Sequence, residues 1–227
     1  NGATAAQIRQ AHAMQNLIAA HERINRSSGS SLGNAAIAAI GIGSVAGIAQ
    51  MMDKWTEFNN RLKLVTASSQ ELKTAQTELV NIATRTGQEL DGVASVYQRF
   101  AANAKQLGIN QQDALGITET VNKAIAIGGA SAEGASAALT QFGQALASGA
   151  LRGEEFNSVM ENAPSLAAAI AKGLDVPVGK LRTLANTGQL TADVLVTALQ
   201  RAAKSVDADF AKTNMTISQS MVNVKTR

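Results

Sequence analysis

Histidine and cysteine, the side chains that most often bind metals or act as nucleophiles, are nearly missing from this chain. Its 227 residues include two histidines, His12 and His21, and no cysteine. Positions nine apart lie on opposite sides of a helix, so we do not expect these imidazoles to share a metal ion. Without cysteine there is no thiolate-bound zinc, thiol nucleophile or iron–sulfur cluster. We therefore predict no metal site and no cofactor, and we interpret both histidines as solvated or interface residues.

Three glutamates, Glu154, Glu155 and Glu161, form the acidic group that could support general acid–base chemistry. Helical muramidase-like enzymes use a glutamate in an aromatic-walled cleft, and a glycosidase typically needs a second carboxylate and a platform for the sugar. This region offers only Phe142 and Phe156 as aromatic residues. We interpret Glu154 and Glu155 as complements of a helix dipole and Glu161 as part of a surface ion pair. A wall-degrading enzyme module stays as an alternative.

Phosphate-binding and nucleic-acid signals are weak. The chain has no GxGxxG after a strand, no GxxxxGK[ST] and no GxSxG. Its formal net charge is +3, with slightly basic ends and a slightly acidic middle. DNA-binding proteins instead gather lysine and arginine into a dense stripe. We predict no specific nucleic-acid binding.

Composition predicts an all-α fold. The chain contains 43 alanines, only two prolines and 3% aromatic residues, with 45% hydrophobic residues overall. Alanine is the best helix former, and proline is the strongest helix breaker. β-branched and aromatic residues, which favour strands, are few. We therefore expect a long N-terminal helix or helices, followed by a compact multi-helix domain of short helices.

The positions of helix-capping residues and of glycines predict that the chain has three parts. Residues 1–67 read as a long Ala/Gly-rich helical segment with a Ser/Gly break near 27–33. Residues 68–200 read as a compact helical domain, in which cap residues and glycine stops alternate. Residues 201–227 read as the start of a further helix. Because the chain begins at Asn1 rather than methionine, we expect it to be a piece of a longer protein.

Helix starts are predicted at specific cap residues. Ser68 followed by Glu71 reads as a capping box, and Asn110 and Ser131 each precede an apolar-periodic segment. Asp91 is expected to cap the helix that carries the only tyrosine.

Small residues repeat every four positions in the uncharged run upstream of residue 53. Ala35, Ala39, Gly43 and Gly47 would form one ridge on a helix, which lets a second helix approach closely. We predict self-association through this ridge. The alternative is a membrane-inserting helix over 33–52 that forms a passage for DNA, because the uncharged run is long enough to span a bilayer.

Two long segments of the sequence resemble a known protein family. The segment "QALASG-LRGEEFNSVMENAP-LA-AIA" over 144–170 resembles the conserved N-terminal domain of tail tape measure proteins of tailed phages and prophages. The stretch over 56–101, "TEFNNRLKLVT…LV-IATRTG…VYQRFA", resembles the same domain. The resemblance covers roughly residues 50–225.

That resemblance implies a structural virion protein and no enzyme. Tape measure proteins occupy the tail lumen, set tail length while tube subunits polymerise around them, and leave ahead of the DNA. The resemblance implies other copies of the chain, the tail tube protein, tail assembly chaperones and distal tail tip proteins as partners, with the host inner membrane met during ejection. It implies the phage tail lumen as location, after assembly in the host cytoplasm. It supplies no catalytic residues for this domain.

The strongest family motif reads as a structural corner between two helices. Glycines end one helix and allow a tight entry into the next, and an arginine could pair with the nearby glutamates. The alternative is a docking patch for a chaperone or the tail tip. The corner comprises Gly149, Leu151, Arg152, Gly153, Glu154, Glu155, Phe156, Glu161 and Pro164.

Overall fold

The computed structural model describes residues 45–213, and every regular element in that range is a helix. The all-α prediction is confirmed. Interpretations made for residues 1–44 and 214–227, including the break near 27–33, lie outside the described residues. The helices are α3 (Val45–Lys63), α4 (Ser69–Thr86), α5 (Leu90–Ala102), α6 (Ala104–Leu107), α7 (Gln111–Ile127), α8 (Ala132–Ser148), α9 (Gly153–Asn162), α10 (Pro164–Gly173), α11 (Val178–Asn186) and α12 (Ala192–Phe210).

The chain divides into two compact units, Asn1–Thr56 and Glu57–Arg227, with the border inside α3. Of the first unit, the structure describes the N-terminal part of α3. The second unit holds the C-terminal end of α3 and all helices from α4 to α12. We refer to Glu57–Thr213 as the compact unit.

Helix starts in the compact unit follow side-chain caps. Ser68 Oγ accepts a hydrogen bond from the Glu71 N–H at 3.1 Å. Asn110 and Asp113 form a reciprocal capping box, each side chain accepting from the other residue's backbone N–H at 3.0 Å. These caps satisfy N–H groups that have no partner within the helix. The caps predicted at Ser68, Asn110 and Ser131 are therefore confirmed. The reciprocal capping box predicted for Ser68 and Glu71 is wrong, because the Glu71 carboxylate accepts from the Ala67 N–H at 2.7 Å and not from Ser68.

The cap predicted at Asp91 is wrong. α5 begins one residue earlier, at Leu90, and Glu89 occupies the N-cap position without a side-chain hydrogen bond. Asp91 lies in the first turn instead, where its carboxylate forms an ion pair with Arg61 of α3. A carboxylate in the first turn is favoured by the helix dipole, as one at the cap would be, so the sequence pattern alone does not separate the two positions.

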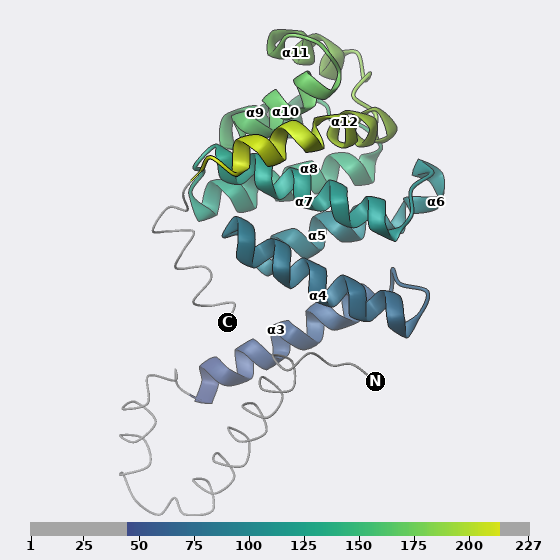
Figure 1. Ribbon diagram of the computed structural model, residues 1–227, viewed down its shortest axis with the longest axis vertical. Coiled ribbons are helices and arrows are strands. Elements are labelled where there is room, and N and C mark those ends of the chain that lie inside the picture. The colour runs from purple at the N-terminus through teal and green to yellow at the C-terminus, as the bar shows by residue number, and fades with distance from the viewer. Residues whose placement is uncertain (1–44, 214–227) are drawn as a thin grey trace, which may run out of the picture. The chain divides into compact units, whose positions relative to one another are not determined.

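The core is built around α7, which packs against α4, α5, α10 and α12 (Figure 1). α5 also packs against α8, and α8 packs against α9. Alanine makes up much of this core, and the few aromatic residues fill its centre: the rings of Phe100 and Phe142 lie 6.3 Å apart at 57°. Small side chains let helix axes come close, so the helices of this core pack tightly.

Helices α10 and α12 approach each other closely at Gly173, the last residue of α10. A Cβ atom placed there would lie 1.9 Å from the carbonyl oxygen of Ala198 in α12. Only a residue without a side chain fits this contact. The glycine that ends α10 therefore also sets how closely α10 and α12 pack.

Candidate interaction surfaces and the motif corner

The small-residue ridge falls largely outside the described residues. Ala35, Ala39 and Gly43 lie in the part of the chain that is not described, and Gly47 lies in the first turn of α3. Self-association through this ridge stays a prediction. Within residues 45–213, no helix is both long enough and apolar enough to cross a membrane.

The motif corner joins α8 to α9. Gly149 ends α8 in the left-handed region, with φ +87°, and Ala150 then forms an isolated antiparallel bridge with Thr191. The Leu151 N–H donates to the Leu190 carbonyl at 2.8 Å on one side of this bridge. The corner is thus hydrogen-bonded to the loop between α11 and α12, about 40 positions later in the chain.

A second backbone bond closes the other side of the bridge. The Ala192 N–H, at the start of α12, donates to the Gly149 carbonyl at 3.0 Å. Gly149 therefore does two things: it turns the chain out of α8, and its carbonyl holds the start of α12. The glycine stop that the sequence predicts is also a tertiary contact.

Two buried apolar side chains of the corner anchor it in the core. Leu151 is 1% exposed and Phe156 is 2% exposed. The Arg182 guanidinium of α11 lies over the Phe156 ring, 5.8 Å from its centroid, and also donates to Asn157 Oδ1 at 3.2 Å. Pro164 begins α10 at the first helical position, where its missing N–H is not needed.

The prediction that Arg152 pairs with a nearby glutamate is wrong. Within residues 45–213 its guanidinium pairs with none of the three corner glutamates. It lies instead against Gly188 in the α11–α12 loop, where an added Cβ would be 3.3 Å from a guanidinium nitrogen. Arg152 precedes α9 in extended backbone, with φ −134°, so its side chain leaves the helix that carries the glutamates.

The three glutamates of the corner lie at the two ends of α9. Glu154 and Glu155 lie in the first turn of α9, where the helix dipole favours negative charge, and Glu161 lies near its other end. Glu154 and Glu161 are exposed and Glu155 is half-buried. In the range 45–213, no three acidic or histidine side chains are grouped so as to hold a metal ion.

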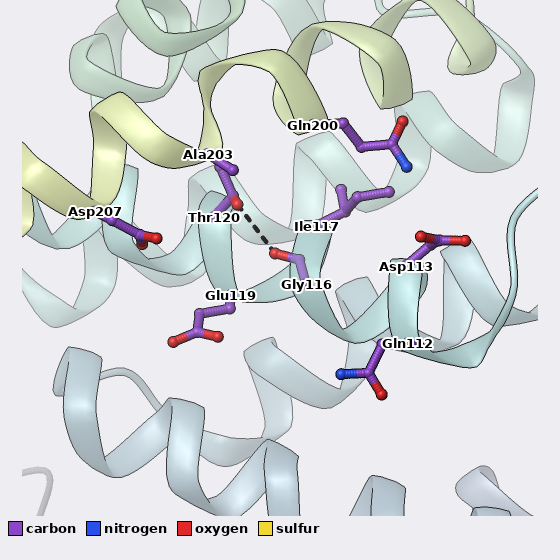
Figure 2. A pocket seen from close by; sticks show the side chains of 9 residues that line it. All are labelled: Gln112, Asp113, Gly116, Ile117, Glu119, Thr120, Gln200, Ala203 and Asp207. Atoms are coloured by element: carbon purple, nitrogen blue, oxygen red, sulfur yellow. Dashed lines mark hydrogen bonds between the residues drawn. The ribbon is translucent and has the colours of Figure 1, made fainter.

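A groove of about 250 Å³ lies elsewhere, between α7 and α12 (Figure 2). Figure 2 shows Glu119 of α7 and Asp207 of α12 among its lining residues, and the Thr120 hydroxyl donating to the Gly116 carbonyl at 3.0 Å. Both carboxylates bind the ammonium of Lys123, at 2.8 and 2.7 Å. The carboxylates of Glu119 and Asp207 are therefore both ion-paired, and the sequence patterns do not indicate this groove.

A family comparison places the chain. A model of a family described as "Tape measure protein" matches residues 46–227. The chain belongs to the tape measure protein family. The match includes the corner and every described helix except the first residue of α3. Comparisons with curated proteins and with solved structures find no match.

Membership in the tape measure family gives the chain a coarse role. The family is structural rather than enzymatic, and it implies a component of the phage tail. The described geometry agrees with this role, since the motif corner is made of turns, buried anchors and backbone hydrogen bonds.

Proposed function

We propose that this chain belongs to a tape measure protein that occupies the tail lumen and sets tail length while the tube polymerises around it. At infection the protein leaves ahead of the DNA. The family match over residues 46–227 carries this proposal. An all-helical chain with an alanine-rich core and no grouped metal ligands in its described part supports it.

The compact unit acts as a folded head and not as the ruler. A ruler needs a constant rise, and a helix supplies about 1.5 Å per residue. The longest helices of the compact unit, α4 and α12, have 18 and 19 residues and would each span less than about 30 Å. They fold back on α7 instead of running end to end. The measuring stretch then lies outside this chain, in a longer protein.

The head has partners on several sides in this proposal. Other copies of the chain pack through the ridge of Ala35, Ala39, Gly43 and Gly47. Tail assembly chaperones and distal tail tip proteins dock on the head, and the tail tube protein encloses the rod. The motif corner is a candidate docking patch because backbone hydrogen bonds hold it to the α11–α12 loop and to the start of α12, and because it presents exposed charge at Arg152 and Glu154.

The test is to follow the protein through infection. Intact tails and tails emptied by ejection are purified from a phage that encodes this chain, and peptides from residues 57–213 are quantified by mass spectrometry. The proposal expects these peptides in intact tails and their loss from emptied ones, with the tube protein retained as the internal control. Absence from intact tails would refute the structural role. Retention in emptied tails would refute ejection ahead of DNA.

A further inference from the structure

Lys123 of α7 lies beside the C-terminal end of α12, where it forms an ion pair with Asp207. Lys123 Nζ of α7 is 2.7 Å from Asp207 Oδ1, and it lies 5.8 Å from the centroid of the Phe210 ring. Asp207 and Phe210 are both in the last turn of α12. One side chain of α7 therefore holds this turn through an ion pair and a cation–π contact.

Lys123 is also part of an ion-pair network that joins α7 to α4. Lys123 Nζ is 2.8 Å from Glu119 Oε1, one helical turn earlier, and the same oxygen lies 2.9 Å from Arg85 Nη2 of α4. The side chain of Lys123 is only 15% exposed and that of Glu119 28%. Ion pairs in a partly shielded network are stronger than isolated exposed pairs.

The ammonium of Lys123 is held in its charged form. Burial by itself lowers the pKa of Lys123, but the carboxylates of Asp207 and Glu119 outweigh this effect and raise the pKa above its usual value. The contacts therefore persist across the neutral range.

Apolar packing of α12 stops before its last turn. Val206 is the last buried apolar residue of α12, whereas Ala208 is exposed and Phe210 is half-buried. Beyond the helix, the side chains of Lys212 and Thr213 form hydrogen bonds to Asp209 and Phe210 of the same turn. The contacts to Lys123 are thus the main tertiary hold on this turn.

We infer that Lys123 is a latch that fixes the C-terminal turn of α12 to α7. Removing its charge, or screening it with salt, releases residues 207–213 while the rest of the compact unit stays folded. The C-terminal turn of α12 is therefore a local switch. This inference does not depend on the proposed role in the tail.

Hydrogen exchange of the 227-residue chain tests the latch. Lys123→Met keeps the apolar stem and removes the charge. We expect amide exchange in residues 207–213 to become about fivefold faster, with α4 and α5 unchanged. Lys204→Met is the matched control, because Lys204 is an exposed lysine of α12 that makes no ion pair among residues 45–213. Lys123→Arg, which keeps the charge, should retain most of the protection.

Salt gives an independent readout. Raising the salt concentration from about 0.05 M to about 0.5 M should speed exchange in residues 207–213 of the wild type and have little further effect in Lys123→Met. Asp207→Asn removes the exposed partner instead and should reproduce the release if Lys123→Met fails to fold. Unchanged exchange in this turn would overturn the latch. Equal acceleration in every helix, or the same acceleration in Lys204→Met, would also overturn it.

Discussion

The contact between α10 and α12 at Gly173 gives the sharpest prediction about stability. Gly173→Ala would place a Cβ atom 1.9 Å from the Ala198 carbonyl oxygen, 2.5 Å from its carbonyl carbon and 2.8 Å from its Cα. An ordinary contact is about 3.5 Å or longer, so about 1.5 Å of overlap must be relieved. The atoms in the way are helix backbone and cannot rotate aside. One of the two helices has to move.

The size of the effect follows from two opposing contributions. Forcing helices apart in a close-packed core costs about 1–3 kcal/mol. Replacing a helical glycine with alanine contributes about 0.5–1 kcal/mol in the other direction, because the unfolded chain loses freedom. The overlap here is with backbone, so the loss wins. We expect Gly173→Ala to lower the free energy of unfolding by about 2 kcal/mol and the Tm by about 4–8 °C.

The chain supplies a matched control. Gly116 lies inside α7 on an exposed face, and a Cβ atom added there meets nothing within 4 Å. Gly116→Ala should therefore raise the free energy of unfolding by about 0.5–1 kcal/mol. Urea unfolding followed by circular dichroism measures both variants. Equal stability of wild type and Gly173→Ala, or a loss in Gly116→Ala as large as in Gly173→Ala, would refute the reasoning.

Three further predictions use single side chains. Burial raises the pKa of Tyr97, so ultraviolet titration of this lone tyrosine should give a midpoint above 10. The stability that protonated Tyr97 contributes is complete below about pH 10 and is lost as the pH rises through its folded-state pKa. Tyr97→Phe should reduce this loss of stability at high pH. A midpoint at or below 10 would contradict this. Asn122 is fully buried and its Oδ1 has no partner, so Asn122→Leu should raise the urea midpoint through a gain of about 1 kcal/mol, and a lower midpoint would count against the orphan acceptor. Asn110→Ala removes the capping box of α7 and should lower the free energy of unfolding by about 1 kcal/mol, while Glu89→Ala, at a cap without a side-chain hydrogen bond, should change it much less in the same unfolding assay.

Local features of the fold were predictable because they depend on neighbouring residues. The caps at Ser68 and Asn110 are set by a side chain and an N–H three positions away. The glycine stop at Gly149 reflects a left-handed φ that other residues avoid. All-α content follows from alanine and from the scarcity of strand formers. None of these needs knowledge of tertiary structure.

Contacts between distant segments were not predictable in the same way. Lys123 and Asp207 are 84 positions apart, and no periodicity links them. The side chain of Arg152 follows the α11–α12 loop, although three glutamates lie closer in sequence. The glycine at the end of α10 looks like an ordinary stop, yet it is required by the backbone of α12. Each depends on how helices pack, which single-sequence patterns do not encode.

The candidate site shows the same division. Its glycines and its first-turn glutamates could be read from the motif, because they act on the chain next to them. The bridge between Ala150 and Thr191 could not, since a two-residue pairing leaves no alternation in the sequence. The family resemblance supplied the role that local physics alone did not reach.

Tail length measured by electron microscopy tests the central claim most directly, namely that the compact unit is a folded head and the ruler lies elsewhere in a longer protein. Two phage variants are compared: one carries extra helical residues in the measuring stretch, and the other carries the same number inserted at the exposed turn of Gly128 and Gly129, between α7 and α8. The account predicts tails longer by about 1.5 Å per residue in the first variant and unchanged length in the second. Lengthening by the same amount in the second variant, or no change in the first, would contradict it.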